Sequence, residues 1–418
     1  MFTLRYFIVV LTGFAIAGTV ALVPIQWGAA QAQQYNTLQK RPVVQVKRKA
    51  AKKAAARPKD TKPEAQERTA FSAEDELNAA VPGIADARTW GDSDAGFARL
   101  LPQLSGPWLA ISGGGADGAY GGGVLAGWTQ SGTRPEFAVV TGSSIGALIA
   151  PFAFLGPRYD EEIRKSFTTV SAADIFEDRA TADSLFDHWP LRRQVEQRIT
   201  AKLLAEIAAE HARGRRLLIA TTNLDSGRRV IWNMGAIAAR GDDNSLKLFR
   251  DVLLASSSIP GFFSPAAIEV EANGKRFQEL HSDGTLTAPF FVLPESMLSP
   301  SASAKPPVSD VYVIVNSKLD PEFKMPDRDV PGVLGRSIGV ALTAALQAQV
   351  ALTKVGALRH GIALRIAHVN PEFNHSSRGP FDGEYMQALY DFGVAAGKNG
   401  TAFKDTLHDA SLRAPSAQ

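Results

Sequence analysis

Short apolar runs rich in β-branched residues alternate with longer segments of helical hydrophobic spacing from about residue 71 onward. This alternation is typical of a parallel sheet covered by helices, because each strand returns to the same edge through a crossover. We expect strands over residues 108–111, 137–141, 216–222, 229–232, 311–315 and 364–368, and helices over 191–211 and 333–359. The sequence therefore predicts one three-layer α/β/α domain over residues 71–418, with a mainly parallel central sheet.

The first 32 residues have a different pattern. Arg5 precedes an apolar run over residues 7–23, and the small residues 30–32, Ala-Gln-Ala, follow it, as in a secretory signal. The run is also about as long as the shortest membrane-spanning helices. Residues 1–32 are therefore expected to be a signal peptide or an N-terminal membrane anchor. The chain is expected to be exported to the cell envelope, as a periplasmic, secreted or anchored protein, although an anchor of opposite orientation would keep it inside.

Residues 33–70 are rich in Ala, Lys and Pro and have almost no large apolar side chain, so we expect a disordered basic linker. Between Lys40 and Lys62 the ten Lys and Arg residues face Asp60 alone, whereas the whole chain carries only +3. The rest of the chain is consequently acidic, which argues against nucleic-acid binding. The linker could associate with a membrane surface through anionic headgroups or be a solvated spacer. The absence of cysteine excludes thiol chemistry and disulfides.

Glycines follow the first predicted strand at once, in the sequence SGGGADG over residues 112–118. Without Cβ atoms, Gly113, Gly114 and Gly115 can turn sharply and point amides at one anion, at the positive end of the following helix. Gly113, Gly115 and Gly118 also match the dinucleotide fingerprint G-x-G-x-x-G. That alternative stays open, but the second predicted strand lacks the acidic residue that would bind the ribose.

The second predicted strand leads into the sequence GSSIG, which places Ser144 between Gly142 and Gly146 and before an apolar helix over 147–155. This G-x-S-x-G pattern between a strand and a helix is the context of a nucleophile elbow. The two glycines allow a tight, strained turn from which the serine hydroxyl projects. Ser144 is therefore the candidate nucleophile.

A serine nucleophile needs a base, and none of the seven histidines has a recognisable triad context. Asp283, in the sequence LHSDGT over residues 280–285, can take that role. Asp-Gly pairs are common in turns, so this position by itself favours a structural interpretation. His281 lies two residues earlier, and we do not expect it to be catalytic.

Taken together and in this order, the three segments resemble the patatin-like phospholipases. Residues 252–265 are also similar to a family segment, and the likeness spans about residues 108–289. The resemblance implies a serine acyl-ester hydrolase that acts on lipids through a Ser144–Asp283 dyad and an acyl-enzyme. It implies an oxyanion hole with the motif glycines Gly113, Gly114, Gly115 and Gly118, and Gly284 and Thr285 as support for the aspartate. No cofactor or metal is required.

The chain departs from the family pattern at three positions: Ser112 where Asp is frequent, Asp117 where a basic residue is frequent, and Thr285 where Gly or Ala is usual. These departures keep open an alternative, a catalytically idle, membrane-tethered interaction protein on the same fold. The phenylalanine pairs near the motifs could line an acyl groove or belong to the core: Phe152 and Phe154, Phe262 and Phe263, Phe290 and Phe291. Two Pro-containing segments, 294–307 and 320–331, are expected to be surface loops, of which one could be a lid.

Overall fold

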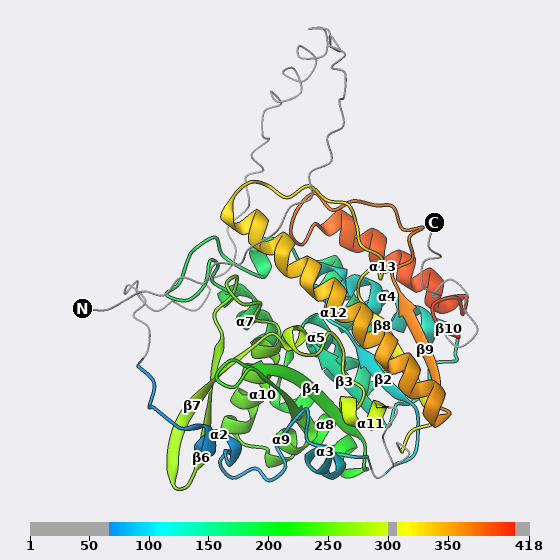
Figure 1. The fold of residues 1–418 in the computed structure, drawn as a ribbon. Helices are drawn as coiled ribbons and strands as arrows, with labels where there is room; N and C mark the ends of the chain where they lie inside the picture. Colours follow the sequence, from blue (N-terminus) through cyan, green and yellow to red (C-terminus); the bar gives the residue numbers. More distant parts are fainter. Residues whose placement is uncertain (1–66, 103, 300–306, 406–418) are drawn as a thin grey trace, which may run out of the picture. The chain divides into compact units, whose positions relative to one another are not determined.

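A ten-stranded mixed sheet forms the centre of the computed structural model, which describes residues 67–102, 104–299 and 307–405 (Figure 1). Its main path runs β1-β5-β4-β3-β2-β8-β9-β10, and β7 pairs with both β4 and β6. The strands are β1 (Arg88–Trp90), β2 (Trp108–Ile111), β3 (Val139–Ser143), β4 (Arg216–Asn223), β5 (Arg228–Asn233), β6 (Ala266–Ala272), β7 (Lys275–Ser282), β8 (Asp310–Val315), β9 (Ala363–His368) and β10 (Lys404–Asp405).

The five central strands, β4-β3-β2-β8-β9, run parallel, and the strands around them pair antiparallel. Parallel strands bring their carboxyl ends to one edge, where ligand sites of open α/β sheets lie. The ends of β2 and β3 are neighbours in register, with Ile111 opposite Gly142. The glycine-rich segment and Ser144 therefore leave the sheet side by side.

Helices cover both faces of the sheet. They are α2 (Ala73–Leu77), α3 (Asp94–Arg99), α4 (Gly118–Gln130), α5 (Ile145–Leu155), α6 (Asp160–Thr168), α7 (Trp189–Arg198), α8 (Ala201–Ala212), α9 (Met234–Arg240), α10 (Asp243–Ser256), α11 (Glu295–Leu298), α12 (Val330–His360) and α13 (Gly383–Lys398). In Figure 1, α12 crosses β8 and β9 on one face.

Side chains that alternate between the two faces of the central strands form two separate hydrophobic cores, one on each face of the sheet. Leu109 and Ile111 of β2 pack with helices α4, α5 and α10, whereas Trp108 and Ala110 pack on the other face with residues of α3, α11 and α12. Side chains of a strand point to opposite faces in turn, so an all-apolar strand requires cover on both sides. The predicted three-layer α/β/α architecture with a mainly parallel centre is confirmed.

The six expected strands all occur, but the second lies over Val139–Ser143, two residues later than predicted. The single helix expected over 191–211 is wrong. Two helices occupy this range, because the Thr200 hydroxyl accepts a hydrogen bond from the Leu203 amide and starts α8 as its N-cap. The hairpin β6-β7 was missed, although Asn273 and Gly274, both with positive φ, form the two-residue turn typical of a hairpin.

Some predictions fall wholly or partly outside the described residues. The signal peptide or anchor and nearly all of the linker lie there, as do residues 300–306 of the first Pro-containing segment, of which Glu295–Leu298 forms α11. In the part of the chain that is described, α12 alone is long and apolar enough to cross a membrane, with 17% of its most apolar window buried. Core helices of soluble proteins can share that length and composition.

Candidate active site

Ser144 occupies a strained turn between β3 and α5. Its φ is 54° and its ψ is −125°, a combination that non-glycine residues rarely adopt. The chain packs tightly around it, because a Cβ on Gly142 would lie 2.4 Å from the Gly146 carbonyl oxygen and one on Gly146 would lie 2.3 Å from the Ile111 carbonyl oxygen. The Ser144 amide donates to Ser256 Oγ at 3.0 Å, which holds the turn against α10. Close packing at both glycines and the hydrogen bond to α10 therefore hold Ser144 in this strained turn.

The carboxylate of Asp283 lies at the end of β7 and meets this turn. Ser144 Oγ donates to Asp283 Oδ2 at 2.7 Å, and both residues are buried. Thr285 directs the other oxygen, because its amide and its hydroxyl donate to Asp283 Oδ1 at 2.8 and 2.6 Å. The Asp283 amide donates to the Ser258 carbonyl oxygen, so the backbone is fixed as well. The aspartate thus offers one oxygen to Ser144 and has the other held in place.

Burial raises the pKa of Asp283 to about 6, because the ionised carboxylate loses its hydration. The hydrogen bonds from Thr285 and Ser144 act in the opposite direction and limit the rise. The resemblance assigned Thr285 only as support for the aspartate. Its hydroxyl has a further part, since it contacts the carboxylate directly.

The glycine loop brings only some of its predicted amides to the site. Gly113 donates its amide to the Pro289 carbonyl oxygen at 3.1 Å, and the Gly118 amide is bonded within the turn over 115–118. These two amides are occupied, which corrects their assignment as oxyanion donors. Gly114 and Gly115 have φ of 153° and 58°, and their amides donate to no acceptor among the described residues. They remain the candidates for binding an anion beside Ser144.

An apolar pocket starts at Gly115 and Ser144 and runs between α5, α6, α7 and α10. Its walls are mostly aliphatic and aromatic side chains, including Leu148, Phe152 and Phe263. Of the six phenylalanines that the sequence singled out as pairs, Phe152 and Phe263 line the pocket and the other four do not. Phe154, Phe290 and Phe291 are buried in the core, and Phe262 lies outside the pocket wall.

The comparison with protein families matches residues 109–294 to the model described as patatin-like phospholipase. Residues 109–294 form a patatin-like phospholipase domain. This range includes Ser144, Asp283 and the glycine loop, and it supports a lipid acyl hydrolase activity in general.

Comparisons with other proteins add little to this identification. Among curated proteins, none matches the chain significantly. Among solved structures, the crystal structure of VipD from Legionella pneumophila is 11% identical, with a TM-score of 0.34, and the match covers 76% of this chain and 71% of that one. At this TM-score the match supports no conclusion about the present chain.

The first strand of the patatin-like domain is tied to β8 by Asn316, which sequence reasoning missed. Its amide donates to Ser112 Oγ at 2.8 Å, its Nδ2 donates to the Ser112 carbonyl oxygen at 2.9 Å, and its Oδ1 accepts from the Gly121 amide at 3.0 Å. Ser112, at the position of a frequent family aspartate, donates its hydroxyl to the Gly113 carbonyl oxygen at 2.7 Å. These bonds fix both sides of the glycine loop.

Asp117, at the position of a frequent basic residue, caps the loop from the side of α13. The Tyr385 hydroxyl donates to Asp117 Oδ1 at 2.8 Å. Burial raises the pKa of Asp117 to about 6, and the Tyr385 hydrogen bond limits this rise. The loop of the patatin-like domain therefore has an acid of raised pKa where the family often has a fixed positive charge.

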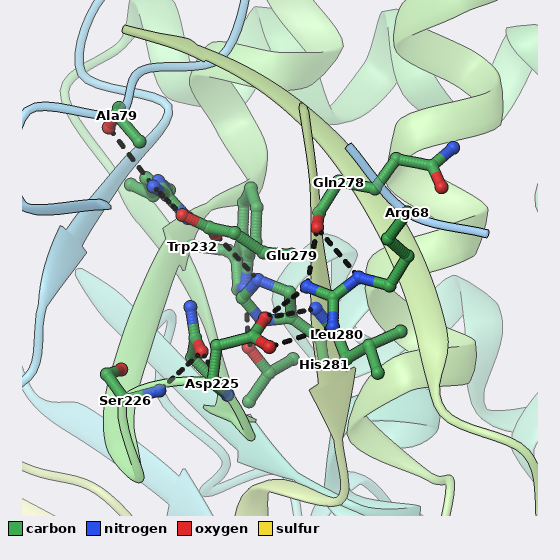
Figure 2. Close-up of polar contacts among 12 residues, drawn as sticks. Arg68, Ala79, Asp225, Ser226, Trp232, Gln278, Glu279, Leu280 and His281 are labelled. Carbon is green, nitrogen blue, oxygen red and sulfur yellow. Dashed lines mark hydrogen bonds and ion pairs between the residues drawn. The ribbon is translucent and has the colours of Figure 1, made fainter. Parts of the chain in front are cut away.

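His281 of β7 belongs to a buried polar cluster that includes Glu279 (Figure 2). Its Nδ1 lies 2.9 Å from Thr221 Oγ1, and its Nε2 lies 3.1 Å from Glu279 Oε2. Arg88 also binds Glu279, with Nη2 donating to Oε1 at 2.9 Å. Burial alone would raise the pKa of Glu279. The hydrogen bonds from His281 and Arg88 outweigh this effect and hold that pKa at about 2. Both ring nitrogens of His281 are engaged, so it is a structural residue of this hairpin.

No group of three or more His, Asp or Glu side chains in the described ranges could hold a metal ion. The chemistry that the geometry offers is that of a serine, a carboxylate and backbone amides next to an apolar pocket.

Proposed function

We propose that this chain is a serine acyl hydrolase that cleaves lipid esters, with Ser144 as nucleophile and Asp283 as general base. The observation that carries the proposal is the 2.7 Å hydrogen bond from Ser144 Oγ to Asp283 Oδ2, formed where an apolar pocket opens. A hydroxyl that already donates to a carboxylate can transfer its proton as it attacks a carbonyl carbon.

The proposed reaction has two steps. Ser144 Oγ attacks the ester carbonyl, its proton passes to Asp283, and the alcohol leaves with that proton as the acyl-enzyme forms. Water then attacks the acyl-enzyme and gives a proton to Asp283, which returns it to Ser144 as the fatty acid is released. In both steps negative charge develops on the carbonyl oxygen, and the unoccupied amides of Gly114 and Gly115 are the proposed donors to it.

The pocket supports a lipid acyl chain as the bound part of the substrate. Ile145, Leu148 and Phe167 are among its wall residues, and Ser144 lines the same pocket. Each methylene that enters such a pocket contributes about 0.8 kcal/mol of transfer free energy. The absence of a fixed positive charge at Asp117 supports esters that do not depend on an anionic headgroup.

The test is hydrolysis of fatty-acyl esters by the purified full chain and by Ser144→Ala, Asp283→Asn and the double variant. Each single substitution should lower kcat/KM by about 10³-fold or more, and the double variant should be no worse, because the two residues act as a unit. Labelling with a fluorophosphonate probe reports on Ser144 independently of the substrate chosen.

An unreactive Ser144 in a folded wild-type chain would contradict the proposal and favour the idle interaction protein. Full activity in Asp283→Asn would instead show that another group is the base. Ser143→Ala is the matched control for the serine substitution, because the Ser143 hydroxyl donates to the Ala288 carbonyl oxygen and not to Asp283.

We also propose that the chain acts outside the cytoplasm, on the basis of the apolar run over residues 7–23 and the small residues that follow it. Fractionation of cells that produce the chain, with mass determination of its N-terminus, tests this proposal. A cytoplasmic protein with an intact N-terminus would contradict it.

A further inference from the structure

Helix α5 starts next to Ser144 and leads along the pocket, because Ile145, Leu148, Ile149 and Phe152 line it at helical spacing. The lining also includes Ser166 of α6 and Gln194 and Arg198 of α7. Of the lining residues of α5, Phe152 lies farthest along the helix from Ser144.

Phe152 and Arg198 also line a second pocket, together with Tyr159, Gln197, Thr200 and Lys202 among others. These two side chains are therefore shared by both pockets and separate them. The second pocket is more polar in character, since its lining includes Glu162, Gln197, Thr200 and Lys202.

Arg198 is held across the gap between α6 and α7. Its Nη1 donates to the Glu162 carbonyl oxygen at 3.3 Å and to the hydroxyl of Ser166, and its Nη2 lies 3.5 Å from Gln194 Oε1. A guanidinium bound in this way leaves the apolar stem of the arginine to cover the pocket end, as long charged side chains do on apolar surfaces. Phe152 is fixed from the other side by its contact with Tyr159, at 5.8 Å between ring centroids.

We propose that Phe152 and Arg198 form the floor of the acyl pocket and set the longest acyl chain that the enzyme accepts. This inference rests on the proposed function, because it assumes that the acyl chain enters the pocket from Ser144. A chain that reaches the floor must either stop there or displace an arginine that is bonded to α6. Removal of the arginine side chain joins the two pockets and gives a longer chain room to continue.

The experiment measures kcat/KM for p-nitrophenyl esters from butanoyl to octadecanoyl, using the full chain and the variants Arg198→Ala and Arg198→Met. In Arg198→Ala the preference should move to longer chains, with the ratio of hexadecanoyl to octanoyl kcat/KM rising about 10-fold or more, since each added methylene contributes up to about fourfold. Arg198→Met keeps an unbranched stem without the charge and should retain the wild-type preference. Arg193→Ala, an exposed arginine of the same helix, is the matched control.

An unchanged chain-length preference in Arg198→Ala, with activity retained on short esters, would overturn the floor while leaving the proposed function intact. Equal effects of Arg198→Ala and Arg198→Met would also overturn it, because they would show that the charge and not the stem matters. If wild type hydrolyses no ester and Ser144 resists a fluorophosphonate, the proposed function itself fails. Should Arg198→Ala not fold, Phe152→Leu gives the second opening of the same floor, and an unchanged preference there would overturn the proposal.

Discussion

At the residue scale, the chemistry of the site depends on how Asp283 is held. Its Oδ2 accepts from Ser144, its Oδ1 accepts twice from Thr285, and the side chain is buried. Burial without hydrogen bonds would keep the carboxyl protonated, and hydrogen bonds without burial would make it a weak base. The balance between these two effects gives a group that is ionised at neutral pH and still takes up a proton readily.

The pH dependence follows from the raised pKa of Asp283, about 6. The base must be ionised, so kcat/KM should be constant above this pH and fall about tenfold per pH unit below it. A pH profile of ester hydrolysis measures this limb. A limb near pH 4, the range of an ordinary aspartate, would contradict the assignment of Asp283 as the base.

Removal of the Thr285 hydroxyl should shift the acid limb of the pH profile of kcat/KM. Its hydrogen bond stabilises the ionised form of Asp283, so Thr285→Val should raise the pKa of Asp283 further and shift the acid limb to higher pH. Thr285→Ser keeps the hydroxyl and should restore the wild-type profile. Overlapping profiles of the Val variant and wild type would show that the hydroxyl has no such effect.

At the scale of the element, alanine substitution should lower activity to different extents at two adjacent glycines of the loop. A Cβ on Gly114 would lie 2.1 Å from the Asn316 carbonyl oxygen, whereas a Cβ on Gly115 meets nothing within 4 Å. Gly114→Ala must therefore move the backbone and should lower kcat/KM by about 10²-fold, the typical cost of losing an oxyanion donor. Gly115→Ala has no such clash. Its cost is the backbone strain of alanine at a positive φ, about 1 kcal/mol, so this variant should retain more activity. Equal losses in the two variants would contradict this account.

The hairpin that carries Asp283 depends on the ion pair behind it. Arg88 and Glu279 are 7% and 0% exposed, so replacement of the arginine leaves an uncompensated buried charge. Arg88→Met should lower the free energy of unfolding by about 3–5 kcal/mol, as measured by urea denaturation. Arg99→Met is the matched control, because Arg99 pairs with Asp86 at the surface and should cost at most about 1 kcal/mol.

At the scale of the whole molecule, the chain separates its charges between the basic stretch 40–62 and an acidic remainder. If the basic stretch contacts membranes, the full chain should sediment with vesicles of anionic lipid and be released by high salt, since exposed charges are screened. Vesicles of zwitterionic lipid are the control. Equal binding to both kinds of vesicle, or binding that is insensitive to salt, would contradict the electrostatic contribution.

Much of the fold and part of the site could be predicted from the sequence. The order of strands and helices, the elbow at Ser144 and the pairing of Ser144 with Asp283 followed from local patterns and from the resemblance. Three features were not predicted: the hairpin β6-β7, the break between α7 and α8 at Thr200, and the role of Asn316. The first two carried local signals that were overlooked, an Asn-Gly turn and a threonine cap. Asn316 carried none, because its three hydrogen bonds join β8 to residues far away in the chain.

By itself, the sequence determined where the backbone must turn and where it must be covered. Glycines and a serine after apolar strands specify a tight turn through sterics, and all-apolar strands specify two layers of helices. The tertiary structure decided which of those glycine amides stay unbonded, how Asp283 is buried and oriented, and where the apolar pocket ends. These properties depend on contacts between residues far apart in the chain, whose distances and solvent exposure no local pattern encodes.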